Sequence, residues 1–383
     1  MARLAACRLF AWTIRRAKSA KSIRMYPTLF TCLRESSVLN KLPMENSNLS
    51  KNRSQSRFSG RSLQMNLIEE ALCKERNKTV LSIQSHVVHG YAGNKASVFP
   101  LQLNGFEVDP INSVQFSNHA GNVEFLNLPK RYEYVRGQRL TDVELNDLYD
   151  GLKLNNINEY SYVLTGYCGN VAFLTKIADI IKDLKNNDPN VFYVCDPVMG
   201  DNGKYYVPKE LLPVYRDIIT PLANVLTPNA FELGQLVGFQ VVTEEDCIRG
   251  MDIIHDLGVT NVVVTSGVEE SEGIDTLTCY ASTRDTTGDV RRFRFRFPRL
   301  QGQFVGTGDV FTSLLIVWLS NCENDVCEAV GHVLGSMQGL IRRTSKYAQA
   351  QVDSNSRKTC ELRLVESRMD LLVPESVIRG EPI

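Results

Sequence analysis

The chain has 383 residues, of which 43% are hydrophobic and 22% are charged, a composition typical of a globular protein. Its 43 basic and 43 acidic residues give a formal net charge of zero, but residues 1–74 carry 14 basic and 4 acidic side chains, whereas residues 75–383 carry 29 and 39. These numbers exclude a collagen-like repeat, a disulfide-dense scaffold and disorder along the whole chain, and they predict that the two regions differ in structure.

Residues 1–74 are predicted to form a basic leader. Residues 1–34 contain eight lysines and arginines and no acidic residue, interspersed with apolar side chains, which is typical of a mitochondrial transit peptide. The next residues, 35–65, are rich in Ser and Asn and poor in apolar side chains, so we expect disorder there. Two alternatives stay open: a solvated basic tail, or translated sequence upstream of a start at Met44 or Met65.

Residues 75–383 are predicted to form a single cytoplasmic α/β domain. Near-continuous apolar runs alternate with helical patterns, which favours a mostly parallel central sheet with helices on both faces. The run at 291–297 alternates Arg with Phe and predicts an antiparallel edge strand with one buried and one wet face. The expected strands are 80–84, 107–112, 162–165, 191–195, 224–226, 261–265 and 276–280, and the expected helices include 171–184, 244–257, 310–319 and 325–341.

Several classes of partner are not expected from this sequence. The most apolar stretch, residues 310–319, has about half the length needed to cross a bilayer. The domain is acidic and the leader lacks aromatic residues interleaved with base-reading groups, which argues against nucleic acid. The ten cysteines are dispersed without a Cys-x-x-Cys motif, which indicates reduced thiols. His86, His89 and His119 lack a fourth ligand at suitable spacing, which argues against zinc.

Polar segments follow the expected strands. In an open α/β sheet, ligands bind beyond the carboxyl ends of the strands, so these segments are the candidates for a site. They are residues 85–91 (SHVVHGY), 196–201 (DPVMGD), 227–232 (TPNAFE), 265–267 (TSG) and 304–309 (FVGTGD).

The last segment predicts an anion site. Gly306 and Gly308 allow the backbone to approach a ligand closely, and the helix that follows directs free N–H groups at it. Asp309 is either a helix cap or, if a hydroxyl group attacks a phosphoryl group here, the general base. Neither a Walker loop nor a His-Arg-Asp kinase motif is present, so phosphoryl transfer requires another architecture.

Three carboxylates on neighbouring strand ends, Asp196, Asp201 and Glu232, are suited to Mg²⁺ that carries nucleotide phosphates. Each taken alone is more simply a loop-capping acid. Their convergence with the Gly-Thr-Gly-Asp turn favours the metal site.

Together these segments resemble pyridoxal kinases of the ribokinase-like superfamily. The turn alone indicates the superfamily, whereas its combination with SIQSH and NSVQFSN is specific to pyridoxal kinases. The resemblance implies a three-layer α/β/α fold, a homodimer, and ATP-dependent phosphorylation of the 5′-hydroxymethyl group of pyridoxal, pyridoxine and pyridoxamine. It is carried by residues 82–91, 112–118 (NSVQFSN), 164–167 (LTGY), 194–201, 226–232, 304–309 and 361–370 (ELRLVESRMD).

The resemblance also implies roles for single residues. Asp309 would accept the hydroxyl proton, and the N–H groups of Gly306, Thr307 and Gly308 would stabilise the moving phosphoryl group. Vitamer contacts correspond to Ser85, Val114, Phe116, Ala120, Tyr167, Gly308 and Asp309. Nucleotide contacts correspond to Asp196, Tyr206, Asn229, Ala230, Phe231, Glu232, Thr265, Ser266, Phe304 and Thr307. Mg²⁺ or another divalent cation would bind Asp201 and Glu232, and K⁺ or Na⁺ would bind Asp196, Thr227 and Thr265.

Three departures from the family pattern keep alternatives open. Ala120 replaces a Thr found in many relatives, and residues 202–205 form a shorter flap than that of animal relatives. Residues 128–139 (LPKRYEYVRGQR) look like a basic insertion on a surface loop. The alternatives are a kinase for another hydroxymethyl substrate, such as hydroxymethylpyrimidine, and a pyridoxal 5′-phosphate-binding relative without turnover.

Overall fold

The fold was obtained as a computed structural model that describes residues 67, 69–71, 78–119, 132, 134–302, 304–351 and 361–383. These residues fall within one unit, Ser59–Ile383. The predicted leader up to residue 66, Ala120 and residues 128–131 and 133 of the predicted insertion at 128–139 lie outside the described residues. No helix in the described ranges is long and apolar enough to cross a membrane.

Ten strands of the described chain form one sheet, in the order β12-β11-β10-β9-β8-β5-β4-β1-β2-β3. Six central strands are parallel, which confirms the predicted mostly parallel sheet: β1 (Thr79–Val87), β2 (Glu107–Phe116), β4 (Tyr162–Thr165), β5 (Phe192–Cys195), β8 (Val225–Leu226) and β9 (Asn261–Val264). Four antiparallel strands complete it: β3 (Gly137–Arg139), β10 (Thr276–Arg284), β11 (Val290–Pro298) and β12 (Glu381–Pro382). A separate hairpin pairs β6 (Gly200–Asp201) with β7 (Lys204–Tyr205).

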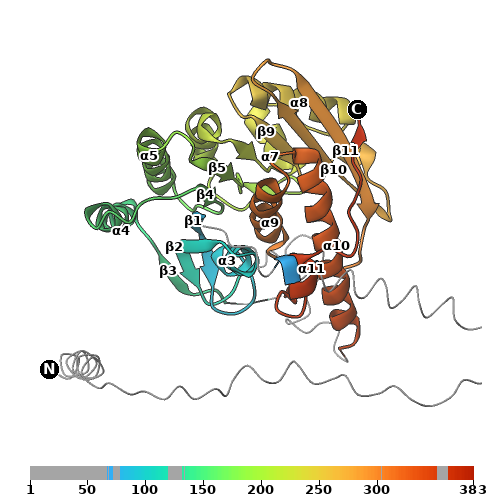
Figure 1. The fold of residues 1–383 in the computed structure, drawn as a ribbon, viewed down its shortest axis with the longest axis horizontal. Helices are drawn as coiled ribbons and strands as arrows, with labels where there is room; N and C mark the ends of the chain where they lie inside the picture. Colours follow the sequence, from blue (N-terminus) through green and yellow to red (C-terminus); the bar gives the residue numbers. More distant parts are fainter. Residues whose placement is uncertain are drawn as a thin grey trace, which may run out of the picture. The chain divides into compact units, whose positions relative to one another are not determined.

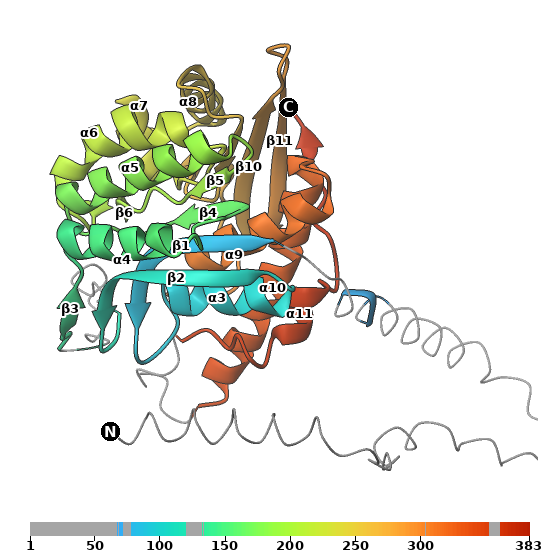
Figure 2. The same ribbon diagram turned by 60° about the vertical axis from the view of Figure 1, so that its left-hand side comes forward.

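Helices cover both faces of the sheet, as Figures 1 and 2 show. One layer contains α3 (Asn94–Leu103), α9 (Thr307–Asn321), α10 (Val326–Gln349) and α11 (Arg368–Leu372). The other contains α4 (Asp142–Leu154), α5 (Val171–Asn187), α6 (Leu212–Val214), α7 (Ala230–Val237) and α8 (Glu244–Asp256), with the shorter turns η1 (Lys209–Leu211), η2 (Tyr215–Ile219), η3 (Thr220–Leu222) and η4 (Glu269–Ser271). The expected three-layer α/β/α arrangement is confirmed.

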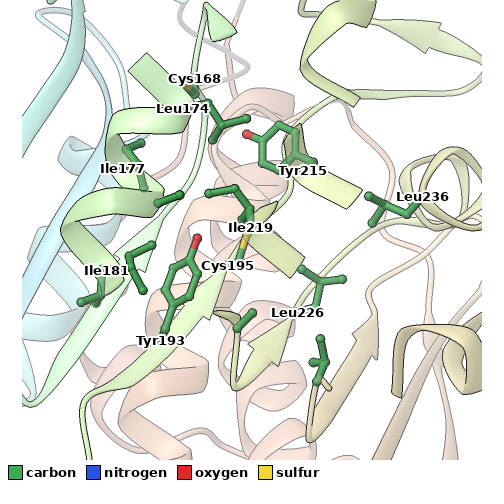
Figure 3. Close-up of a cluster of buried hydrophobic side chains, with 14 of the residues drawn as sticks. Cys168, Leu174, Ile177, Ile181, Tyr193, Cys195, Tyr215, Ile219, Leu226 and Leu236 are labelled. Atoms are coloured by element: carbon green, nitrogen blue, oxygen red, sulfur yellow. The ribbon is translucent and has the colours of Figure 1, made fainter. Parts of the chain in front are cut away.

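Each face of the sheet has its own apolar core because successive residues of a strand point to opposite faces. In β5, Tyr193 and Cys195 pack toward α5 and α7, whereas Val194 packs toward α9 and α10. Figure 3 shows the first cluster, in which Tyr193 and Tyr215 are fully buried. The second cluster includes Phe295 of β11 together with the apolar residues of α9 and α10.

The prediction of an edge strand at 291–297 is wrong in two respects. β11 pairs with β10 along its length and, at Phe293 and Arg294, also with β12, so it is not the edge of the sheet. The face that carries the arginines is not fully exposed to solvent either, because Arg292 and Arg294 form ion pairs with acidic residues of α8. The predicted antiparallel pairing itself is confirmed.

Other boundaries also differ from the sequence-based ones. Residues 137–139, predicted as surface loop, form the edge strand β3 against β2. β1 continues past Gln84 to Val87, with an irregularity in its pairing to β2 between Gln84 and His86. The predicted helix 325–341 begins one residue later, with Asp325 as its N-cap, and continues to Gln349.

Candidate functional site

The amino terminus of α9 is built around Gly306. This residue is the N-cap and has φ +85°, and a Cβ at its position would lie 2.3 Å from the carbonyl oxygen of Tyr91. Both conditions require glycine. Because a glycine N-cap has no side chain to accept a hydrogen bond, the first N–H groups of α9 are available to an anion. The structure therefore supports the predicted anion site.

The Asp309 carboxylate is held by a segment distant in sequence. Its Oδ2 accepts a hydrogen bond from the Gly93 N–H at 2.8 Å, and its backbone carbonyl accepts one from Ser97 Oγ at 3.0 Å. The alternative that Asp309 caps α9 is wrong, because Gly306 occupies the N-cap. Burial raises the pKa of Asp309, and the Gly93 hydrogen bond opposes this effect. The sequence analysis missed Gly93.

The three predicted carboxylates gather near this turn. Asp196 follows β5, and a Cβ at Gly308 would lie 3.4 Å from its Oδ2. Burial raises the pKa of Asp196 well above its usual value, and the negative charges of Glu232 and Asp309 raise it further. Burial also raises the pKa of Asp201. Such mutual repulsion among buried carboxylates is relieved when a cation binds between them.

Glu232 has the geometry of the loop-capping alternative. Its Oε2 accepts from the Asn229 N–H at 3.0 Å while Asn229 Oδ1 accepts from the Glu232 N–H at 2.9 Å, which is a capping box for α7. Its Oε1 accepts from the N–H groups of Met199 at 2.9 Å and Gly200 at 3.3 Å. Burial raises the pKa of Glu232 despite these donors. Glu232 thus ties the segment after β5 to α7.

The predicted nucleotide-side residues lie along the ends of β8 and β9. Asn229 Nδ2 donates to the Gly200 carbonyl at 2.8 Å. The Phe231 ring meets the Tyr205 ring edge-on, with centroids 5.3 Å apart. Phe304 packs against the core beside α9. Further contacts join Thr227 Oγ1 to Thr312 Oγ1 at 3.3 Å and to the Cys195 carbonyl at 3.4 Å, the Thr265 N–H to the Pro228 carbonyl at 3.0 Å, and the Ala230 N–H to the Ser266 carbonyl at 2.9 Å.

The short flap is a hairpin. Asn202 and Gly203 have φ of +50° and +76°, as a two-residue turn between antiparallel strands requires. Tyr205 Oη donates to Gln235 Oε1 of α7 at 2.5 Å. The flap is thus held against α7.

Three predicted contact residues line one pocket of about 480 Å³: Phe116, Tyr167 and Tyr206. Arg136 and Arg139 also line it, and the Arg139 guanidinium lies 5.0 Å from the Phe116 ring centroid, within cation–π range. The sequence analysis missed both arginines because it placed them on a surface loop, although the basic run itself was visible in the sequence.

Two other predicted vitamer contacts, Ser85 and Val114, lie on β1 and β2. Val114 is buried on β2, where it pairs with Arg139 of β3. Ser85 occupies the irregularity in β1, and a Cβ at Gly93 would lie 2.4 Å from Ser85 Oγ. Irregular strand pairing of this kind is common beside active sites. Ala120 lies outside the described residues.

The histidines considered for zinc have other surroundings. His119 Nε2 lies 3.1 Å from Glu361 Oε1, and burial together with Lys95 lowers the pKa of His86. Among the residues the structure describes, a different trio could hold a metal ion: Cys322, Glu328 and His332, whose ligand atoms lie within 4.8 Å of one another. That trio is at the carboxyl end of α9, opposite the Asp309 end.

Comparisons with known proteins agree on one family. Residues 159–353 match the family model described as phosphomethylpyrimidine kinase. A relative from Caenorhabditis elegans is 67% identical over 301 residues, which are 79% of this chain and 92% of that protein. The pyridoxal kinase of Bos taurus is 42% identical over 318 residues, which are 80% of this chain and 99% of the enzyme. Among solved structures, pyridoxal kinase from Leishmania donovani in complex with ADP and pyridoxamine is 34% identical, with a TM-score of 0.72, and the match covers 80% of this chain and 100% of that one.

Two buried thiols near the carboxylates are predicted to be unreactive. Cys168 and Cys195 are fully buried (Figure 3), and burial raises the pKa of each to about 12. At neutral pH the thiolate fraction is then about a thousandfold below that of a free cysteine, and the thiolate is the reactive form. Iodoacetamide followed by peptide mass spectrometry should label the partly exposed Cys322 and Cys327 in the folded protein. Cys168 and Cys195 should be labelled only in urea, and rapid labelling of Cys195 without urea would contradict its burial.

Proposed function

The chain belongs to the pyridoxal kinase family, and we propose that it transfers the γ-phosphoryl group of ATP to the 5′-hydroxymethyl group of pyridoxal, pyridoxine and pyridoxamine. The observation that carries this proposal is the position of the Asp309 carboxylate in the first turn of α9, directly after Gly306, Thr307 and Gly308. A proton acceptor and several free N–H donors thus lie within one helical turn, which is what attack by a hydroxyl group on a phosphoryl group needs.

In the proposed reaction, Asp309 takes the proton of the 5′-hydroxyl group as its oxygen forms a bond to the γ-phosphorus. The bond from that phosphorus to the β,γ-bridging oxygen breaks, and ADP leaves with the electron pair. The N–H groups of Gly306, Thr307 and Gly308 stabilise the negative charge on the moving phosphoryl group. Ser85 binds the pyridine ring by a hydrogen bond.

The vitamer ring would occupy the pocket beside Phe116 and Tyr167. Both side chains line it, and Val114 lies on the same strand as Phe116. Aromatic and apolar surfaces of this kind bind a flat ring, while a few polar groups fix its orientation. The pocket is the support for this placement.

We assign the nucleotide and its cations to the carboxylate side of the site. Asp201 and Glu232 would hold Mg²⁺ or another divalent cation, which supplies positive charge at the ATP phosphates when bound. Asp196, Thr227 and Thr265 would hold K⁺ or Na⁺ through carboxylate and hydroxyl oxygens. The support is that burial and mutual repulsion disfavour the ionised state of Asp196 and Glu232 when no cation is bound.

Replacing Asp309 by Asn should lower turnover at least about 10²-fold, because the amide cannot accept the hydroxyl proton. ATP binding should change little.

Because the raised pKa of Asp309 favours its protonated form, wild-type activity should be lost, as pH falls, at a higher pH than an ordinary aspartate would give. Steady-state kinetics across pH and calorimetric ATP binding check both points. Near-normal turnover by the Asn variant would refute the assignment of the base.

A substrate panel with ATP, Mg²⁺ and K⁺ tests the proposed substrate class. The three vitamers should be phosphorylated in preference to hydroxymethylpyrimidine. The pyrimidine is included because the matching family model is described as phosphomethylpyrimidine kinase. Preference for the pyrimidine would favour that second function. Tight binding of pyridoxal 5′-phosphate without phosphorylation of any vitamer would favour a non-catalytic relative.

Removal of divalent cations by EDTA should abolish turnover, and added Mg²⁺ should restore it. Asp201→Asn should raise the Mg²⁺ concentration needed for half-maximal activity, because one carboxylate ligand becomes a neutral amide. Asp275→Asn is the matched control, since Asp275 is exposed in the loop before β10. Equal Mg²⁺ requirements for the two variants would contradict the assignment of Asp201.

We further propose a homodimer formed through the β2 edge of the sheet and α4. Among the described residues, β3 pairs with Val114–Phe116 and the Leu140 N–H donates to the Ser113 carbonyl, and no strand is described beside the earlier part of β2 at this edge. A groove of about 610 Å³ beside it is lined by the apolar residues Ile111, Leu140 and Leu148 together with polar residues of β2, β3 and α4. Val143 and Leu154 of α4 are 63% and 84% exposed. Exposed apolar side chains beside a strand edge are typical of a protein interface, and a symmetric second copy would bury them.

Leu148→Asp should convert the dimer to a monomer, because it replaces an apolar contact of the proposed interface by a charge that the dimer would bury. The control is Ile274→Asp, which changes an apolar residue that is 92% exposed and outside this groove. Sedimentation equilibrium measures the mass of each variant. A wild-type monomer, or a dimer unaffected by Leu148→Asp, would contradict the proposed interface.

A further inference from the structure

We propose that Glu361 is a positioning residue for the general base: its carboxylate anchors the turn of residues 88–93, which presents the Gly93 N–H to Asp309. This inference rests on the proposed role of Asp309 as the base. Glu361 opens the segment at 361–370 that carried part of the family resemblance, and the mechanism above gives that segment no role.

Glu361 is a buried carboxylate with three hydrogen-bond donors. Its Oε2 accepts from the Tyr91 N–H at 3.1 Å, and its Oε1 accepts from Tyr132 Oη at 2.8 Å and lies 3.1 Å from His119 Nε2. Glu361 is only 7% exposed. Although burial opposes ionisation, the His119 and Tyr132 contacts lower the pKa of Glu361, so it is a carboxylate at neutral pH.

The turn is held between Glu361 and α9 with no spare room. Gly90 has φ +83°, and a Cβ there would lie 2.0 Å from Glu361 Oε2, so the carboxylate lies directly against the backbone. The next residue, Tyr91, donates its N–H to Glu361, while its carbonyl oxygen lies against Gly306. Two residues further along, Gly93 donates to Asp309. Glu361 and Asp309 therefore bind the same short turn.

Glu361 is itself fixed by the layer of helices that contains α10. Leu362 and Leu364 are buried in that core, and the Arg363 N–H donates to Thr344 Oγ1 of α10 at 3.1 Å. Because these contacts fix Glu361, its hydrogen bond with the Tyr91 N–H also fixes the turn of residues 88–93. Displacement of a reacting group by about 1 Å can lower the rate about 10²-fold. Loss of the Glu361 carboxylate should therefore displace the Asp309 carboxylate and lower the rate.

The test compares Glu361→Ala and Glu361→Gln with the control Glu366→Gln. Glu366 lies in the same segment, but it is exposed and pairs only with Arg363 among the contacts described here. The Ala variant should lower kcat about 10- to 100-fold, while KM for ATP stays within about threefold. The Gln variant keeps one acceptor oxygen and should lose less. The control should match wild type, and thermal unfolding verifies that each variant is folded.

A pH profile separates positioning from mere support of the fold. The hydrogen bond from the Gly93 N–H stabilises the ionised form of Asp309. Loosening the turn should weaken this bond, so the acid limb of the kcat/KM profile should move to higher pH in both Glu361 variants. A smaller folded fraction would lower the rate without moving that limb. If the Ala variant does not fold, the Gln variant alone decides.

The proposal is wrong if the folded Gln variant has both the wild-type kcat and the wild-type acid limb. Asp309→Asn, assayed in parallel, separates the two claims. If Asp309→Asn retains turnover, the assignment of the base fails. If Asp309→Asn loses turnover while the Glu361 variants match wild type, only the positioning role fails.

Discussion

The hydrogen bond from the Gly93 amide to the Asp309 carboxylate joins two segments that are more than two hundred residues apart in the chain. It can form only because the turn after β1 approaches the start of α9 closely, and that approach needs glycine at 306. The bond sets the direction of the carboxylate and keeps it available to a substrate instead of the helix end. Asp196 lies beside the same turn, because a Cβ at Gly308 would lie 3.4 Å from its Oδ2.

The net negative charge of the domain opposes the binding of an anion, and the local structure of the site compensates for this charge. Residues 75–383 carry ten more acidic than basic side chains, yet the proposed nucleotide is an anion. Bulk charge cannot attract it, so binding depends on oriented N–H groups at α9 and on cations held by carboxylates. Burial and the negative charges of Glu232 and Asp309 raise the pKa of Asp196, so this part of the protein disfavours uncompensated negative charge. Arg136 and Arg139 supply positive charge in the lining of the pocket that contains Phe116 and Tyr167.

The sequence predicts the order of strands and helices well, because buried parallel strands read as apolar runs and each ends in polar residues. It also predicts the glycine turn, since Gly306 and Gly308 stand directly before an apolar helix. It could not predict Gly93 or Glu361 as neighbours of the site, because their positions depend on long-range contacts and not on periodicity. Arg139 of β3 was misplaced for a related reason: three residues are too few for a strand pattern, and only pairing with β2 defines the strand.

The two-residue strand β12 has a consequence for the behaviour of the protein in concentrated solution. β11 has nine residues and alternates Arg with Phe from Arg292 to Phe297, and an open strand of that length would offer its backbone to strands of other molecules. β12 covers it at Phe293 and Arg294, and Glu381 forms ion pairs with Arg294 and Arg296. Pro382 has no N–H group, so β12 is itself a poor template for further pairing. This short cover protects the sheet against edge-to-edge aggregation.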